Sequence, residues 1–195
     1  MNKKKVSTNQ ITIIALAAVI NIVGGQVALL LRLPIYLDCI GTVFIGAVLG
    51  PVFGIIPGFI SCVINGITTD IYSLYFMIPH LITGMMVGLV FKTKWAKTWR
   101  VCIGTLVMAM PSIVISSGIC AYLFGGVTSS GSALIVFILR KIGTNMWASV
   151  FVVQLITEYA DRLLAVGIAI VVIKTMPKDV LSRIKGENRK YGAIQ

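Results

Sequence analysis

The sequence predicts an all-α membrane protein, a compact bundle of six transmembrane helices with both termini in the cytoplasm. Two observations lead to this fold class. Of the 195 residues, 57% are hydrophobic and only 12% are charged, and a water-soluble domain of this size cannot bury so large an apolar fraction. The apolar residues also form runs that can cross about 30 Å of hydrocarbon at about 1.5 Å per helical residue.

Six apolar runs are predicted to span the membrane. The second is short, and Gly50 and Pro51 separate it from the third, which predicts a tight hairpin or a partly re-entrant pair. A further run at 133–139 is too short to cross and is expected at the surface or in a loop. The first run is long enough to stay in the membrane, which argues against a cleaved signal peptide. The predicted spans are residues 11–31, 36–49, 52–68, 74–91, 101–124 and 149–173.

The distribution of positive charge orients this bundle. Of the 17 Lys and Arg residues, 13 lie in residues 3–5, 92–100 and 174–190, which fall on one side of the membrane if there are six spans. Basic loops remain in the cytoplasm, so both termini are predicted there. The net charge of +11 is therefore read as a topology signal. It also favours contact with anionic lipids, and nucleic acid is not an expected partner.

One domain is expected to occupy the whole chain. Trp95 and Trp99, four residues apart among basic side chains, are typical of anchors at the membrane interface. The predicted parts are a cytoplasmic N-terminus at 1–10, the helical bundle at 11–173 and a basic cytoplasmic tail at 174–195.

The segment LPIYLDCIGT, residues 33–42, carries the first indication of a binding site. It is a proline-led loop that brings Asp38 to the mouth of an apolar helix. Glycines then recur every four residues at positions 46, 50, 54 and 58, a spacing that places them on one helical face and permits close packing of backbones in lipid. The same topology places loops 32–38, 69–73 and 125–146 outside the cell. Long external loops often form binding sites or lids, although 125–146 could equally be a plain connector.

The last predicted span contains Glu158, Asp161 and Arg162. Glu158 precedes Arg162 by four residues, the favourable order for an ion pair on a helix. A charge inside the membrane costs at least about 2.5 kcal/mol, so these side chains should face the bundle interior or a wet cavity. Two interpretations stay open: a structural ion pair, or a group that contacts a ligand. His80, the only histidine, similarly fits either a hydrogen-bonded packing residue or a ligand contact.

Several classes of function lack their sequence signals. There is no GxxxxGK[ST], HExxH or GxSxG pattern, and a single histidine offers little for catalysis. The four cysteines lie in apolar runs without metal-ligand spacing, so they are interpreted as packing residues. We therefore predict that the protein is not an enzyme, and we assign it no catalytic residue, metal or cofactor.

These features together resemble a known family. The lysine-rich start, ALAAVIN at 15–21, LPIYLDCIGT at 33–42, the glycine series and the acidic and basic residues late in the last span resemble the substrate-binding S components of energy-coupling factor (ECF) transporters, closest to the riboflavin- and cobalamin-related branch. The resemblance implies a multi-pass plasma-membrane protein that binds a vitamin-like molecule from outside. It also implies delivery through an ECF transmembrane coupling subunit driven by two ATPase subunits.

The resemblance also implies a docking surface on the first helix. Family members dock through Ala-x-x-x-Ala on the first helix, and the nearest match here has Asn at the second position. The predicted docking residues are Ala15, Ala17, Ala18 and Asn21. The predicted substrate contacts are Asp38, Thr42, Asn65, Tyr72, His80, Glu158 and Arg162. A stand-alone secondary transporter or small channel and a non-transporting membrane scaffold remain alternatives.

Overall fold

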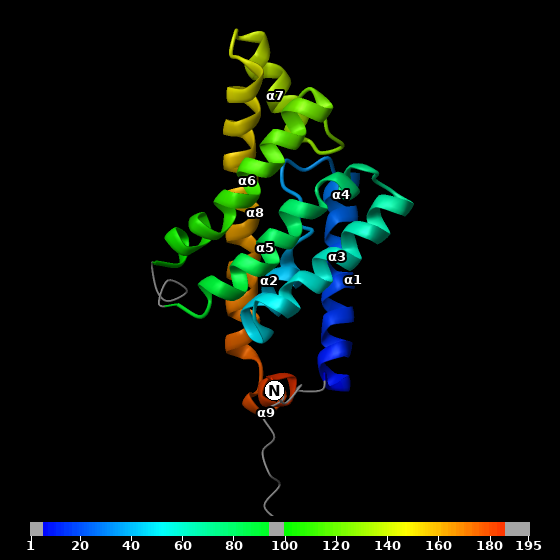
Figure 1. Ribbon diagram of the computed structural model, residues 1–195, viewed down its shortest axis with the longest axis vertical. Helices are drawn as coiled ribbons and strands as arrows, with labels where there is room; N and C mark the ends of the chain where they lie inside the picture. Colours follow the sequence, from blue (N-terminus) through cyan, green and yellow to red (C-terminus); the bar gives the residue numbers. More distant parts are fainter. Residues whose placement is uncertain (1–5, 94–99, 186–195) are drawn as a thin grey trace, which may run out of the picture.

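The computed structural model describes residues 6–93 and 100–185, and every regular element within these residues is a helix (Figure 1). The predicted all-α fold is therefore confirmed. The long helices α1 and α8 run along the length of the molecule, with α7 at one end and α9 at the other, where α1 also begins. The helices are α1 (Thr8–Leu30), α2 (Ile40–Leu49), α3 (Pro51–Thr68), α4 (Tyr72–Tyr75), α5 (Met77–Val90), α6 (Arg100–Phe124), α7 (Ser132–Lys141), α8 (Met146–Thr175) and α9 (Lys178–Lys185).

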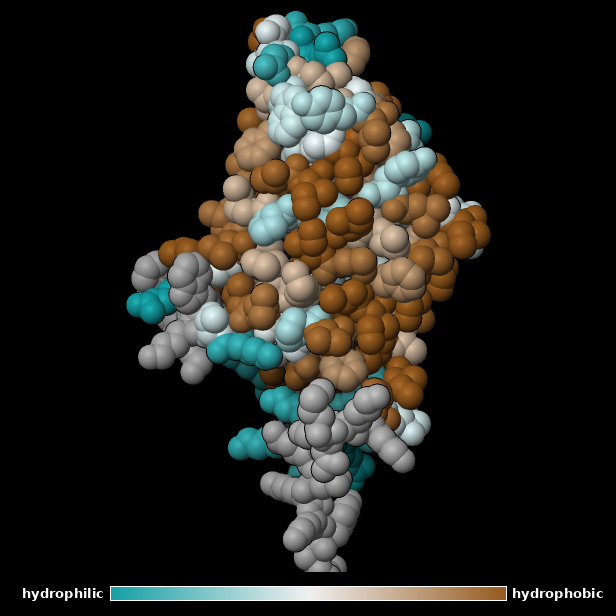
Figure 2. Space-filling view, in the orientation of Figure 1, coloured by the Kyte–Doolittle hydropathy of each residue, from teal (hydrophilic) through white to brown (hydrophobic). Residues whose placement is uncertain are grey.

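Each predicted span coincides with one helix: α1, α2, α3, α5, α6 and α8. Among the described helices, α1, α3 and α6 are long and apolar enough to cross a membrane, while α2 and α5 are apolar but shorter. Figure 2 shows a broad hydrophobic surface over the middle of the molecule and hydrophilic residues towards both ends. Together these features identify an all-α membrane protein. Trp95, Trp99 and the basic residues at 3–5, 94–99 and 186–195 lie outside the described residues.

Side-chain caps define where α1 and α8 begin. At the start of α1, Ser7 accepts a hydrogen bond from the backbone of Gln10, and the Gln10 side chain accepts one from Ser7, which forms a capping box. At the start of α8, the Asn145 side chain accepts a hydrogen bond from the backbone of Ala148 at 3.0 Å. The short apolar run at 133–139 forms most of α7, which packs on α8 and leaves Phe137 exposed.

The glycine series packs helices together, but not as one helical face. Gly50 has a φ of +95° and alone joins α2 to α3, so the pair is a tight hairpin. This conformation suits glycine because it lacks a Cβ. A Cβ on Gly54 would lie 2.5 Å from the backbone oxygen of Gly84 on α5, and one on Gly46 would lie 3.0 Å from the same atom. The expected single face is thus divided between two helices that both pack on α5.

The largest apolar cluster of the described residues lies towards the α9 end of the bundle. It is formed where α2, α5, α6 and α8 meet, and its buried side chains include Val43, Val87, Met108, Ala165 and Val166. The polar residues of these helices lie closer to the α7 end. The half towards α7, called the polar half below, holds these polar groups together with a second apolar cluster formed by Cys120, Val136, Val150 and Val153.

Candidate functional site

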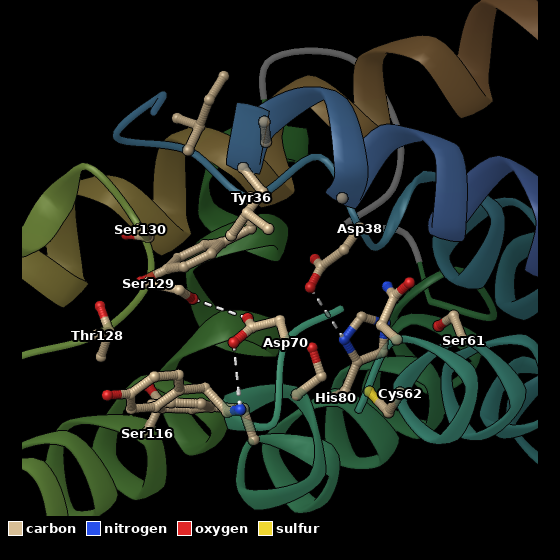
Figure 3. Close-up of a pocket in the computed structure, with 18 of the residues that line it drawn as sticks. Tyr36, Asp38, Ser61, Cys62, Asp70, His80, Ser116, Thr128, Ser129 and Ser130 are labelled. Atoms are coloured by element: carbon tan, nitrogen blue, oxygen red, sulfur yellow. Dashed lines mark hydrogen bonds and ion pairs between the residues drawn. The ribbon is translucent and has the colours of Figure 1, made fainter. Parts of the chain in front are cut away.

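A cavity of about 100 Å³ lies in the polar half of the bundle (Figure 3). It is lined by α1, α3, α5, α6 and α8 and by the three loops that were predicted to be external. Hydrogen bonds tie these loops together: the Gly131 N–H donates to the oxygen of Leu33 at 3.2 Å, and the Ser129 hydroxyl donates to Asp70 at 2.7 Å. Segments far apart in sequence thus close one site.

Six of the seven predicted substrate contacts line this cavity: Asp38, Asn65, Tyr72, His80, Glu158 and Arg162. Their role towards a ligand remains a prediction. The seventh, Thr42, does not belong to the lining and is fully buried. Its hydroxyl lies 3.3 Å from His80 Nε2, so it supports His80 from behind.

A buried chain of hydrogen bonds fixes the orientation of His80. The Gly41 N–H donates to Asn21 Oδ1 at 2.7 Å, which makes the other end of the Asn21 amide a donor. That amide donates to Thr42 Oγ1 at 2.8 Å, and the Thr42 hydroxyl proton is then directed to His80 Nε2. The network therefore places the proton of neutral His80 on Nδ1. His80 Nδ1 lies 3.8 Å from Asp38 Oδ2, and Figure 3 shows the two side chains facing each other.

The Asp38 carboxylate is poorly satisfied by the protein. Its side chain is 32% exposed and lines the cavity. Its Oδ1 atom is buried but has no hydrogen-bond partner. Burial raises the pKa of Asp38 above its ordinary value, and the positive charge of Arg162 opposes that shift. A ligand that donates to Oδ1 would supply what the protein leaves out.

The charged residues of α8 are, in contrast, well paired. Arg162 Nη1 lies 2.6 Å from Asp161 Oδ2, and Arg162 Nη2 lies 3.9 Å from Glu158 Oε2. The predicted i,i+4 pair exists, but the neighbouring residue Asp161 makes the shorter contact. The Leu37 N–H donates to Asp161 at 2.7 Å, and the hydroxyl of Ser116 donates to Glu158. This group therefore ties α8 to α6 and to the loop before α2.

Asp38, Cys39 and Asp161 also bring potential metal-ligand atoms within 4.8 Å of one another. The Cys39 thiol donates to Asp161 Oδ2 at 3.1 Å, and that same oxygen accepts the Arg162 guanidinium. A positive group already neutralises this carboxylate, so the cluster is an ion pair with a thiol donor rather than a built cation site.

The lining includes residues that the sequence did not single out as contacts. The Tyr36 hydroxyl donates to Gln154 at 2.9 Å and lies 3.4 Å from Ser132 Oγ, linking the loop before α2 to α7 and α8. Ser116 on α6 lines the cavity and donates to Glu158, whereas Ser112 lies outside the lining, with its hydroxyl 3.4 Å from Glu158 Oε2. Their four-residue spacing in an apolar span was an available signal for a polar helix face.

The predicted docking role of α1 remains a prediction, and most of the residues named for it lie inside the chain. Ala17, Ala18 and Asn21 are buried inside the chain, because α1 packs closely on the start of α2. A Cβ on Gly41 would lie 2.0 Å from the backbone oxygen of Ala17. Only Ala15 of the predicted set is on the exposed side of α1.

A membrane helix bundle that encloses a loop-covered polar cavity defines a small-molecule binding or transport protein. The family model for the substrate-specific component of ECF transporters matches residues 9–173, and the chain belongs to that family. Its members are binding subunits for transport and not enzymes, and they work with ECF transmembrane and ATPase subunits. Searches of curated proteins and of solved structures gave no match.

Proposed function

We propose that this chain captures a small vitamin-like molecule at the outer face of the plasma membrane and delivers it through an ATP-driven ECF complex. The observation that carries the proposal is the polar cavity closed by three loops at the end away from α9. A scaffold would not need such a site. The riboflavin- and cobalamin-related branch remains a prediction.

The experiment is uptake into proteoliposomes, with the chain reconstituted alone or together with the ECF coupling and ATPase subunits. The readout is accumulation of the compound that copurifies with the chain in mild detergent. We expect uptake only with the complete complex and ATP, because the chain has no P-loop of its own. Full transport by the chain alone would favour the secondary-transporter alternative. Absence of any bound small molecule would favour the scaffold.

We further propose six spans with both termini in the cytoplasm. The basic residues of α9 and the start of α1 lie at the same end of the molecule, and α9 packs on α1. Single cysteines at Ile142 and Lys178, in a variant that lacks the exposed Cys102, test this topology. In intact cells an impermeant reagent should label position 142 and not position 178. Labelling of position 178 from outside contradicts the orientation.

The exposed side of α1 is the proposed surface for the coupling subunit. Its side chains include Ala15, Leu16 and Val19, which form an apolar stripe at helical spacing. Ala15→Trp should abolish uptake but leave ligand affinity near normal, because it changes only this outer surface. Val114→Trp, on the exposed side of α6, is the matched control and should transport normally. Normal uptake by Ala15→Trp would remove α1 as the docking surface.

A further inference from the structure

The cavity is unevenly charged. Three carboxylates line it, from Asp38, Asp70 and Glu158, against the single guanidinium of Arg162. Asp161 adds a further negative charge just behind the lining, in contact with Arg162. His80 Nδ1 lies 3.8 Å from Asp38 Oδ2 and adds a positive charge only when the imidazole is protonated. The lining therefore carries more acidic than basic groups, an arrangement that disfavours an anionic ligand and favours one with hydrogen-bond donors or a positive charge.

The positive charge of Arg162 is already engaged. Its two terminal nitrogens face Asp161 and Glu158, so a ligand carboxylate or phosphate would have to compete with two internal carboxylates. Arg162 Nε, however, has no hydrogen-bond partner. One neutral acceptor of a ligand, such as a hydroxyl or ring nitrogen, could bind there without displacing either acid.

The negative charges differ in their availability. Glu158 accepts from Ser116 and Ser112, and Asp70 accepts from Ser129 and the backbone of Tyr72. Asp38 alone among these three has a buried oxygen with no partner. Figure 3 shows its carboxylate directed into the cavity with His80 behind it. A ligand donor that reaches Asp38 would find an acceptor that the chain leaves without a partner.

We propose that the substrate is a small organic cation with N–H donors, such as a protonated amine or an amino-substituted heteroaromatic ring, and that Asp38 binds its positive end. This inference rests on the proposed capture function and names the substrate class for that same cavity. Aromatic side chains in the lining, Tyr36, Tyr72 and Phe76, provide faces for a ring or a cation. His80, held by Thr42 and Asn21, positions the Asp38 carboxylate.

The first test identifies the compound released from the chain purified in mild detergent, by mass spectrometry. A cation or an amino-substituted heteroaromatic compound supports the inference. A compound whose only charged groups are carboxylates or phosphates overturns it but leaves the capture function intact. If no compound copurifies and no probe binds, the capture function itself fails and the inference fails with it.

The second test uses three pyridines of similar size that carry an aminomethyl, a hydroxymethyl or a carboxylate group at the same ring position. The readout is competition against the released compound. The aminomethyl probe should bind most tightly and the carboxylate probe least. In Asp38→Asn the affinity for the aminomethyl probe should fall by about tenfold or more, as expected for loss of a charged hydrogen bond. Equal affinity for all three probes in the wild-type chain overturns the inference without reference to any variant.

Matched variants separate the charge from the fold. Asp38→Glu retains the charge and should retain the preference for the aminomethyl probe. Asp179→Asn makes the same chemical change as Asp38→Asn, but on α9 and outside the cavity lining, and it should leave the affinities unchanged. An Asp38→Asn variant with unaltered preference among the probes overturns the role of Asp38.

Discussion

Two groups of charged residues in this bundle lie close together yet are satisfied in opposite ways. Asp161 on α8 accepts from the backbone of Leu37, from the Cys39 thiol and from Arg162. Asp38, one residue before Cys39, has His80 at 3.8 Å and an oxygen with no partner. Both acids incur a desolvation cost. The partners of Asp161 offset that cost, which indicates a structural role. Asp38 instead leaves an acceptor for a ligand.

The largest effect is expected from breaking the partnered group. Arg162→Gln would leave Asp161 and Glu158 buried with no counter-charge, and removal of one member of a buried ion pair costs about 3–5 kcal/mol. The measurement is thermal unfolding in detergent, followed by the loss of helical signal. A stability equal to that of the wild-type chain would contradict the structural role of the group.

A double variant sharpens this prediction. Asp161→Asn combined with Arg162→Gln removes the charges of the shortest pair together, so it should be more stable than Arg162→Gln alone. The difference in stability between the two variants separates the effect of the uncompensated charge from the effect of lost side-chain packing.

The next effect concerns the scaffold that holds both groups in place. Gly54→Ala puts a Cβ 2.5 Å from the backbone oxygen of Gly84, so α3 and α5 must separate, at a cost of about 1–3 kcal/mol. Gly118→Ala is the matched control. Its Cβ would meet nothing within 4 Å, and this helical position should gain up to about 1 kcal/mol. Equal unfolding temperatures for the two variants would show that α3 and α5 are not packed this closely.

The fold and the site were predictable to different degrees. Helix type and position followed from apolar runs, because each run that can span a bilayer has few alternatives to a helix. The interior positions of Glu158 and Arg162 followed from the cost of charge in lipid. The burial of Ala17 could not be predicted from the sequence. Because α1 is apolar on every side, its periodicity does not distinguish the face towards α2 from the face towards lipid.

The site needed contacts that one sequence does not supply. Asp38 was identified from its place at a helix mouth, and that signal is local. The role of Thr42 could not be identified from the sequence. Whether Thr42 lines the cavity or supports His80 depends on how α2 packs on α5. The preference of Arg162 for Asp161 over Glu158 likewise depends on the loop before α2, which holds Asp161 through Leu37.

The third prediction concerns Asn21, which connects α1 to Gly41 and Thr42 at the start of α2. Asn21→Ala would restore the family pattern Ala-x-x-x-Ala and, if residue 21 were a docking position, it would strengthen association with the coupling subunit. The structure predicts a different result, because the change leaves the Gly41 N–H and the Thr42 hydroxyl with a lost partner inside the bundle. The expected cost is about 1–3 kcal/mol of stability. Improved copurification of the coupling subunit with Asn21→Ala would contradict the interior position.

The smallest effect on stability is expected at Asp38. Asp38→Ala removes a carboxylate that the chain does not satisfy, so the free energy of unfolding should change by less than about 1 kcal/mol, with an increase more consistent with the structure than a decrease. Asp161→Ala, the matched change in the partnered group, should cost about 3–5 kcal/mol. Affinity for the copurified compound should weaken in Asp38→Ala by about 1–3 kcal/mol. A large loss of stability with unchanged affinity would show that Asp38 has a structural role in the loop before α2. Asp38 and Asp161 would then no longer differ in the way proposed here.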